Sequence, residues 1–282
     1  METISKIDEL RARINEWRNR KQCIALVPTM GNLHVGHLSL VKRALSIADH
    51  VVVSIFVNPL QFGPSEDYET YPRTLEADQK KLEPLGTHLL FVPQVTDIYP
   101  AGMEASTHVK VPGLGEKLCG ISRPSHFMGV ATIVNMLFNL VQPHKALFGE
   151  KDYQQLLIIK RMATDLHMPV EIISVPTVRE TDGLAMSSRN NYLNAKQRAI
   201  APLLFQIIDD IRMRIETGER NFTQLENQAL LRLTEAGFKP DYVAVRQAQT
   251  LDIPEKKEEK LVILAAAGLG KARLIDNVAV HC

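Results

Sequence analysis

Short apolar runs alternate with amphipathic stretches along the first 176 residues of the chain. Each run is rich in Val, Ile or Leu and is bounded by loop residues, which is typical of strands buried in a parallel sheet. The predicted strands are 23–28, 50–59, 87–93, 145–150 and 169–177. The stretches that separate them carry apolar residues at helical spacing and predict helices at 35–48, 68–86, 130–141 and 152–168.

Strands that alternate with helices in this way predict an α/β fold with a Rossmann-like, doubly wound parallel sheet. Such sheets bind ligands beyond the carboxyl ends of their strands, so the loops that directly follow the strands are the candidates for a functional site. These loops read "PTMGNLHVGH", "VNPLQFGPSEDY", "VPQVTDIYPAG" and "FGEKDYQQ".

The pattern of the chain changes near Pro176. A polar loop, "VPTVRETDGLAMSSRNNYL", leads into predicted helices at 196–216 and 222–236, followed by predicted strands at 241–247 and 260–267. This order of elements indicates a smaller α+β domain. We therefore expect two domains, residues 1–176 and residues 177–282.

Composition and charge exclude several classes of function. The formal net charge is +1 at pH 7, so the chain lacks an overall field that would attract nucleic acid or an anionic membrane. Three widely spaced cysteines form neither a disulfide framework nor a zinc cluster, and no apolar run resembles a membrane span or an export signal. These features predict a cytoplasmic enzyme or binding protein.

Two histidines, His34 and His37, stand where the first predicted strand passes into a helix. Side chains three residues apart face the same side of a helical turn, and the first turn also offers unpaired backbone N–H groups and the positive end of the helix dipole. Gly31 and Gly36 allow a ligand to approach the backbone closely. The imidazoles are therefore candidates for stabilising phosphate charge; in the alternative, one caps the helix and the other packs.

The loops after two other strands carry polar candidates. Asn58 and Gln61 are neutral amides, which suit a small substrate with hydroxyl and carboxylate groups, although Asn-Pro is also a common turn. Lys151 is a point charge suited to phosphate, or else part of a solvated charged run at a helix start. Gln154 and Gln155 are neighbours, so only one of them can face a cleft.

Three further groups carry polar chemistry. The loop "AMSSRN" offers two hydroxyls and Arg189 for polyphosphate binding, although a plain Ser-rich loop is the alternative. Arg123 and His126 form another candidate patch. Asp78 and Glu76 are candidate Mg²⁺ ligands, but surface carboxylates on a helix explain the same pattern.

Six motifs occur in one order along the chain: "PTMGNLHVGH", "VNPLQFG", "YPRTLEAD", "SRPSHFMGV", "FGEKDYQQ" and "MSSRN". Together they resemble the pantothenate synthetase (pantoate–β-alanine ligase) family, whose HxGH turn is shared with a wider nucleotidylyltransferase superfamily. The motifs are dense from about Val27 to Asn190, and the likeness continues more loosely to "LGKARLIDN".

The resemblance implies a two-step ligation. The carboxylate of (R)-pantoate attacks the α-phosphorus of ATP, with Mg²⁺, and gives pantoyl adenylate and pyrophosphate. The amine of β-alanine then attacks the acyl carbon and releases AMP and pantothenate. The resemblance also implies that residues 1–176 bind nucleotide and pantoate, that residues 177–282 act as a lid, and that the chain forms a homodimer.

The family pattern also implies roles for individual residues. The catalytic residues would be His34, His37 and Lys151. The residues that bind pantoate or β-alanine would be Asn58, Gln61, Arg123 and Gln155, and Asp78 would bind the metal. The ATP-binding residues would be Met30, Gly31, Asn32, Leu33, His34, Val35, Gly36, His37, Gly149, Glu150, Lys151, Asp152, Val178, Met186, Ser187, Ser188 and Arg189.

Two other functions remain open at this point. A nucleotidylyltransferase of the same fold would need a pocket for a phosphate-bearing acceptor, and the amides at Asn58, Gln61 and Gln155 argue against one. A nucleic-acid-binding remnant of a synthetase is disfavoured by the near-zero net charge and the single tryptophan.

Overall fold

The computed structural model describes residues 1–64, 66–255 and 257–281, and the chain divides into two compact units. Unit 1 comprises Met1–Glu116, Arg123–Glu150 and Gln154–Pro176. Unit 2 comprises Lys117–Ser122, Lys151–Tyr153 and the chain from Thr177 onward. The main division lies near Pro176, but the two short segments, which the sequence assigned to the first domain, belong to unit 2.

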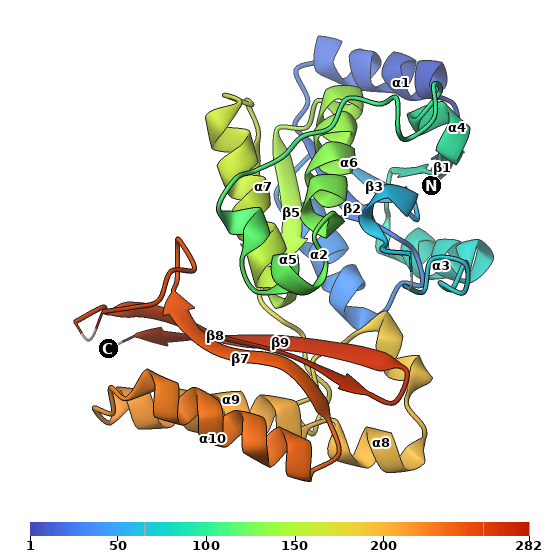
Figure 1. Ribbon diagram of the computed structural model, residues 1–282. Helices are drawn as coiled ribbons and strands as arrows, with labels where there is room; N and C mark the ends of the chain where they lie inside the picture. The colour runs from blue at the N-terminus through green and yellow to red at the C-terminus, as the bar shows by residue number, and fades with distance from the viewer. Residues whose placement is uncertain (65, 256, 282) are drawn as a thin grey trace. The chain divides into compact units, whose positions relative to one another are not determined.

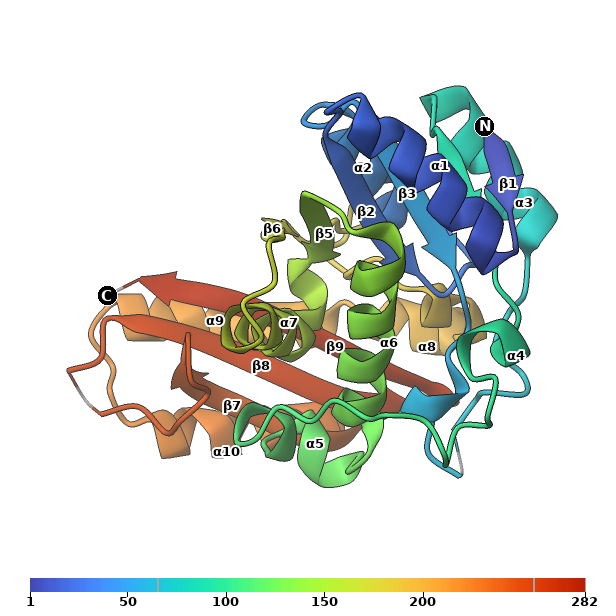
Figure 2. The same ribbon diagram turned by 90° about the horizontal axis from the view of Figure 1, so that it is seen from above.

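Unit 1 is built on a six-stranded sheet in which every pair of neighbouring strands is parallel (Figure 1). The strands are β1 (Glu2–Ile4), β2 (Ile24–Thr29), β3 (His50–Ile55), β4 (Leu89–Phe91), β5 (Lys145–Gly149) and β6 (Glu171–Val175). Their order is β1-β4-β3-β2-β5-β6, and Figure 2 shows β2 and β3 running side by side. The order reverses at β2, so the carboxyl end of β2 is the topological switch point at which such sheets bind ligands.

Helices cover both faces of this sheet, which confirms the predicted α/β class. Ala25 and Val27 of β2 face the cluster that also contains Val41 and Ala44 of α2. The alternate residues point to the opposite face, where α6 packs against β2 and α1. The helices are α1 (Ile7–Asn19), α2 (Val35–Leu45), α3 (Leu75–Leu82), α4 (Val95–Ile98), α6 (His126–Val141) and α7 (Tyr153–Asp165), with α5 (Cys119–Ser122) in unit 2.

Two local predictions for unit 1 are wrong. The helix predicted over 68–86 begins only at Leu75, because Pro72 disfavours a helical conformation for the residue before it and the chain from Pro72 to the cap at Thr74 is irregular. The three-residue β1 was not predicted, since an edge strand this short shows no periodicity of its own and forms by pairing with β4.

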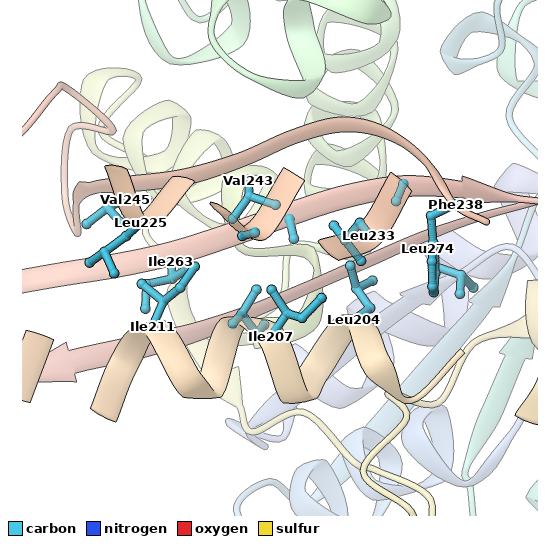
Figure 3. Close-up of a cluster of buried hydrophobic side chains, with 14 of the residues drawn as sticks. Leu204, Ile207, Ile211, Leu225, Leu233, Phe238, Val243, Val245, Ile263 and Leu274 are labelled. Atoms are coloured by element: carbon cyan, nitrogen blue, oxygen red, sulfur yellow. The ribbon is translucent and has the colours of Figure 1, made fainter. Parts of the chain in front are cut away.

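Unit 2 contains a three-stranded antiparallel sheet covered on one face by two helices (Figure 1). The strands are β7 (Lys239–Gln247), β8 (Lys260–Leu269) and β9 (Ala272–His281), and the helices are α8 (Ala195–Ile200), α9 (Leu203–Glu216) and α10 (Phe222–Glu235). Ile207 and Ile211 of α9 and Leu225 of α10 pack with Ile263 of β8 (Figure 3). The smaller α+β domain predicted from the sequence is thus present.

The structure corrects two details of unit 2. The single helix predicted at 196–216 is divided into α8 and α9 around Pro202, which has no backbone N–H to continue the helical hydrogen bonds. Strand β9 was not predicted, and it pairs with β8 along its whole length. None of the helices in the described part of the chain is both long and apolar enough to cross a bilayer.

Histidines occupy the amino end of the parallel sheet in unit 1. The His88 Nδ1 accepts a hydrogen bond from the Val51 N–H at 3.1 Å, at the start of β3. His50 stacks on Trp17 with ring centroids 4.1 Å apart, and its Nε2 lies 2.9 Å from the Gln22 Oε1. Burial lowers the pKa of His50 and that of His88 below their ordinary value of 6.5.

We expect these two histidines to make unit 1 less stable in mild acid. Their lowered pKa means that the folded chain binds these protons less readily than the unfolded chain, whose histidines take up protons as the pH falls below about 6.5. The free energy of unfolding should therefore fall as the pH decreases through this range. Urea unfolding between pH 7 and pH 5 measures the slope, and a His50→Phe, His88→Asn double variant should flatten it because phenylalanine keeps the stacking and asparagine keeps an acceptor. If the free energy of unfolding depended on pH in the double variant as it does in the wild type, His50 and His88 would not be the cause of the acid sensitivity.

Candidate active site

The turn after β2 has a backbone shape that depends on glycine. Gly31 has φ +81°, and a Cβ there would lie 3.1 Å from the Ile55 Cγ2 and 3.3 Å from the Asp78 Oδ2. Asn32 follows with φ +50°, in the left-handed region that asparagine tolerates. The two residues turn the chain sharply from the end of β2 into the start of α2, and place His34 at the first helical turn.

A completely buried carboxylate holds this turn. The Asp78 Oδ2 accepts the Asn32 N–H at 2.8 Å, and its Oδ1 accepts the Leu33 N–H at 2.7 Å. The Thr74 hydroxyl donates to Oδ2 at 3.2 Å. The interpretation of Asp78 as a surface carboxylate is therefore wrong. Both oxygens accept hydrogen bonds from the chain, so Asp78 holds the shape of the histidine turn, and its role toward Mg²⁺ stays a prediction.

Replacing Asp78 with asparagine tests whether this carboxylate acts only on the histidine turn. One oxygen becomes an NH₂ group that faces a backbone N–H, so we expect the free energy of unfolding to fall by about 2 kcal/mol. If the carboxylate acts only on the turn, the Mg²⁺ concentration that gives half-maximal activity should stay the same. Thermal unfolding and a Mg²⁺ titration of the residual activity measure the two effects. A large rise in the Mg²⁺ requirement without loss of stability would restore the metal role.

His34 and His37 cap the start of α2 for each other. The His34 Nδ1 accepts the Gly36 N–H at 3.1 Å, and the His37 Nδ1 accepts the His34 N–H at 3.3 Å. The two rings are half-buried, with centroids 4.1 Å apart. Since each Nδ1 is an acceptor, each neutral ring carries its proton on Nε2. Capping and charge stabilisation therefore do not compete, because capping uses Nδ1 and presents Nε2–H as a donor.

The other turn residues with a predicted ATP role differ in exposure. Leu33 is buried in the core, so only its backbone is available near the turn. Val35 is 54% exposed. Met30, Asn32 and Gly36 are half-buried, and Gly31 is buried.

The amides predicted for the substrate pocket do not share one role. Asn58 is 1% exposed, and its Nδ2 donates to the Gly129 carbonyl at 3.1 Å and to the Gln61 Oε1 at 3.3 Å. Its Oδ1 accepts the Tyr99 hydroxyl at 2.7 Å. Its hydrogen-bonding groups are thus used within the chain, and the substrate role of Asn58 stays a prediction. Gln61 donates its Nε2 to a weak acceptor, the Met30 Sδ at 3.0 Å, which links the pocket to the histidine turn.

The two neighbouring glutamines on α7 point to different surroundings. Gln154 is 4% exposed and donates its Nε2 to the Leu114 carbonyl at 2.8 Å. Gln155 is half-buried. The structure thus assigns Gln154 to the interior of the protein and leaves Gln155 as the candidate for the substrate.

Arg123 is engaged by a carboxylate of its own unit. Its Nε and Nη2 donate to the two oxygens of Glu66, each at 2.5 Å. Burial raises the pKa of the Glu66 carboxyl, but the hydrogen bonds and charge of Arg123 outweigh burial and bring the pKa below its ordinary value. The charge of Arg123 is thus balanced by Glu66, and its substrate role stays a prediction. His126 lies nearby, with its Nδ1 2.9 Å from the Gln61 carbonyl oxygen.

Lys151 belongs to unit 2 and lies in a short 3-10 turn, Glu150–Asp152, directly after β5. Its side chain is 19% exposed, and its Nζ lies 3.8 Å from the Asp152 Oδ2. The Asn277 Nδ2 on β9 donates to the Lys151 carbonyl at 2.9 Å. Gly149, at the end of β5, has open space where a Cβ would be.

The segment that contains "MSSRN" is hydrogen-bonded into unit 2. The Met186 N–H donates to the Val178 carbonyl at 2.9 Å, and the Ser187 Oγ caps the turn Ser188–Tyr192 by accepting the Arg189 N–H at 3.2 Å. The side chains of Val178, Met186, Ser187, Ser188 and Arg189 are half-buried. The hydroxyl of Ser187 therefore has a structural role in addition to the ATP role predicted for it.

Sequence reasoning missed the residues that anchor this segment. Arg179 donates two hydrogen bonds to the buried Asp276 of β9, at 2.6 and 2.9 Å, and its guanidinium stacks on the Phe205 ring at 3.7 Å. The adjacent Asn277 holds Lys151, so two neighbouring residues of β9 anchor both predicted phosphate-binding segments of unit 2. The alternation of "ARLIDNVAVH" was the available signal, because it is the pattern of a strand.

The described residues contain no group of three or more His, Cys, Asp or Glu side chains arranged to hold a metal ion. Mg²⁺ commonly binds with few protein ligands when phosphate oxygens complete its coordination. The residues of this chain therefore fit Mg²⁺ only as a companion of a bound triphosphate.

Comparison with known proteins identifies relatives over the whole chain. The family model for pantoate-β-alanine ligase matches residues 2–279. Pantothenate synthetase from Hahella chejuensis is 55% identical over 281 residues, which cover 100% of this chain and 99% of that protein. The pantothenate synthetase from Shewanella baltica (strain OS223) is 56% identical over 278 residues, and 99% of each chain is covered.

Solved structures agree with this assignment. The crystal structure of pantothenate synthetase from Thermus thermophilus matches with a TM-score of 0.93 at 45% identity, with 100% of each chain covered. The pantoate-β-alanine ligase from Francisella tularensis, complexed with beta-gamma ATP and β-alanine, matches with a TM-score of 0.82 at 35% identity over 99% of this chain and 97% of that one. The chain belongs to the pantoate–β-alanine ligase family.

Proposed function

We propose that the chain condenses (R)-pantoate with β-alanine in two steps driven by ATP. In the first step, a pantoate carboxylate oxygen forms a bond to the α-phosphorus of ATP, and the bond to the pyrophosphate leaving group breaks. In the second step, the β-alanine nitrogen bonds to the acyl carbon, AMP leaves and the nitrogen loses a proton. Membership of the family supports the overall reaction.

The observation that carries the first step is the pair of Nε2–H donors at the switch point of the sheet. Their Nδ1 atoms are occupied by backbone N–H groups, so His34 and His37 are oriented before any ligand binds. Nucleotidyl transfer requires mainly positioning and stabilisation of negative charge on the phosphates. We assign these donors, together with the cations Lys151 and Arg189, to the phosphates of ATP.

Two neutral amides are proposed to bind pantoate, those of Gln61 and Gln155. A cation would hold the pantoate carboxylate firmly and weaken its attack on phosphorus, whereas an amide orients the carboxylate and leaves it nucleophilic. Gln61 supports this assignment because its Nε2 contacts the weak acceptor Met30 Sδ, which a substrate oxygen would readily replace.

The experiment that tests the function measures pyrophosphate release from ATP with one acid at a time. We expect release with pantoate, and little with other small hydroxy acids or with phosphorylated acceptors. Adding β-alanine should then produce AMP and pantothenate in equal amounts. Release that depends on a phosphorylated acceptor would instead identify a nucleotidylyltransferase of the same fold.

Removing either pocket amide should weaken the use of pantoate and leave ATP binding nearly intact. In Gln61→Ala and Gln155→Ala variants, a substrate oxygen loses its donor, which costs about 1–3 kcal/mol in pantoate-dependent activity. Pantoate-dependent pyrophosphate release and calorimetric ATP affinity measure the two effects. Gln154→Ala is the matched control, because this buried amide binds the Leu114 carbonyl and its loss should lower stability without changing the KM for pantoate. Loss of ATP affinity in the pocket variants would place these amides at the nucleotide.

Three features of the proposal come from the family pattern alone. We propose that Mg²⁺ accompanies ATP, that two copies of the chain form a homodimer, and that the enzyme works in the cytoplasm. Chelation followed by addition of Mg²⁺ tests the first, light scattering in solution tests the second, and cell fractionation tests the third.

A further inference from the structure

Tyr99 is a buried tyrosine that follows α4 and lies 41 positions along the chain from Asn58. Its side chain is 3% exposed, and its hydroxyl donates to the Asn58 Oδ1 at 2.7 Å. Burial raises the pKa of this hydroxyl above its ordinary value, so it keeps its proton and acts as a donor. The partner atom on Asn58 is the oxygen of the amide.

This contact is the shortest of those that orient the Asn58 amide. With Oδ1 facing Tyr99, Nδ2 faces two carbonyl oxygens, that of Gly129 at 3.1 Å and the Oε1 of Gln61 at 3.3 Å. The Leu60 N–H also approaches Oδ1, at 3.4 Å, which agrees with the same orientation. The opposite orientation would place an NH₂ group against the Leu60 N–H and an oxygen against two oxygens.

The orientation of the Asn58 amide also sets that of the Gln61 amide. Because its Oε1 accepts from Asn58, its Nε2 faces the other side, where it contacts the Met30 Sδ. The backbone beneath it is also held, since a Cβ at Gly129 of α6 would lie only 2.5 Å from the Leu60 carbonyl oxygen and 2.7 Å from the Gln61 Cα. Gln61 can therefore meet a ligand as a hydrogen-bond donor.

We propose that Tyr99 is a positioning residue for substrate recognition, which acts through Asn58 to hold the amide of Gln61 with its N–H group toward the substrate. The inference rests on the proposed role of Gln61 in binding pantoate. It explains why a pocket for an anion can use a neutral residue: the fixed amide offers only its donor, so it accepts a carboxylate or hydroxyl oxygen and disfavours a group that donates. Tyr99 itself does not touch the substrate.

A double-mutant cycle between Tyr99→Phe and Gln61→Ala tests this relation. We expect Tyr99→Phe alone to raise the KM for pantoate roughly tenfold while the KM for ATP changes less than about twofold. In the Gln61→Ala background, Tyr99→Phe should cause no further change in the KM for pantoate, because the amide that it orients is gone. Equal effects of Tyr99→Phe in both backgrounds would show a general structural role and overturn the proposal.

Tyr242→Phe is the matched control for loss of a buried tyrosine hydroxyl. The Tyr242 hydroxyl lies 2.9 Å from the Cys119 Sγ in unit 2. Tyr242 is not among the residues proposed to bind ATP or pantoate. This variant should lower the melting temperature as Tyr99→Phe does, and should leave the KM for pantoate unchanged. A similar rise in that KM would mean that lost stability explains the effect, which contradicts the proposal.

Asn58→Asp tests whether the Asn58 amide sets the direction of the Gln61 amide. An aspartate still accepts from Tyr99, but the atom that faced Gln61 becomes an acceptor, so the Gln61 amide turns and presents Oε1 to the substrate. We expect the kcat/KM for pantoate to fall roughly 100-fold, and pantoamide, whose amide can donate, to inhibit the variant better relative to pantoate than it inhibits the wild type. An unchanged preference between pantoate and pantoamide would overturn the inference.

The cycle separates this inference from the function on which it rests. If Gln61→Ala raises the KM for pantoate but Tyr99→Phe does not, the positioning role is wrong and the pocket remains. If Gln61→Ala leaves that KM unchanged, the assignment of Gln61 and the role of Tyr99 are both wrong. The ligation itself is judged independently, by pantoate-dependent release of pyrophosphate in the wild type.

Discussion

A chain with glutamine in place of His37 should keep its fold and lose adenylate formation by roughly 100-fold or more, as expected for a lost donor to developing phosphate charge. Glutamine at this position still accepts the His34 N–H that the His37 Nδ1 accepts in the structure, so the helix cap is preserved. The imidazole Nε2–H is removed, and the NH₂ group of glutamine, bonded to the same carbon as the capping oxygen, does not take its place. Pantoate-dependent pyrophosphate release without β-alanine, followed by rapid quenching, measures this step alone.

His34→Asn gives the same test for the other ring. Asparagine is a strong helix cap, and its side-chain oxygen can accept the Gly36 N–H in place of the histidine Nδ1. We expect a melting temperature close to that of the wild type and a similar loss of adenylation. His34→Ala and His37→Ala add the loss of the cap, so they should be less stable than the capped variants and no more active. Full adenylate formation in His37→Gln or in His34→Asn would show that the replaced histidine takes no part in the reaction.

Lys151→Met should abolish most of the first step, by roughly 100- to 1,000-fold, and affect the second step less. Methionine keeps much of the length of the side chain and removes the charge, while the backbone carbonyl that Asn277 binds is unchanged. The charge matters most when pyrophosphate forms, because negative charge then grows on the leaving group. Single-turnover assays started with ATP and pantoate, or with supplied pantoyl adenylate, separate the two steps.

Lys110→Met is the control for removal of a lysine charge. Lys110 is an exposed residue of unit 1 whose Nζ pairs with the Glu116 Oε1 at 2.7 Å, and pairs of this kind contribute little to stability. We expect both steps to run at the wild-type rate in this variant. Equal damage to both steps in Lys151→Met would show that this lysine is not mainly a ligand of the phosphates.

Features that depend on neighbours along the chain were accessible from the sequence. Buried parallel strands are continuous apolar runs, so β2 and β5 were predicted within one residue of their observed bounds, whereas β3 begins at the predicted His50 but ends at Ile55 and not at residue 59. The strand–turn–helix order also placed the two histidines on the first turn of α2, because that placement depends only on consecutive residues. These local patterns were enough to determine the α/β class and the motif that identifies the family.

Hydrogen-bond partners far apart in the sequence could not be predicted from it. Asp78 lies 46 residues from Asn32, and nothing in "LEADQ" distinguishes its carboxylate from that of a solvated helix. Arg123 and Glu66 are 57 residues apart, so the sequence showed a cation without the carboxylate that balances it. Whether a polar side chain is available to a substrate depends on such partners, and only the folded chain brings them together.

The sequence by itself thus determined the class of fold, the histidine turn and the family, because each of these depends on short runs of consecutive residues. The tertiary structure decided which polar residues hold the site and which are left to act on a ligand. Asn58 and Gln61 are close neighbours along the chain and look equivalent in the sequence, yet the hydroxyl of Tyr99 engages the first, and the second turns its N–H group toward the weak acceptor Met30 Sδ. That distinction arises because a buried amide must satisfy its donors and acceptors with whatever groups the fold packs around it.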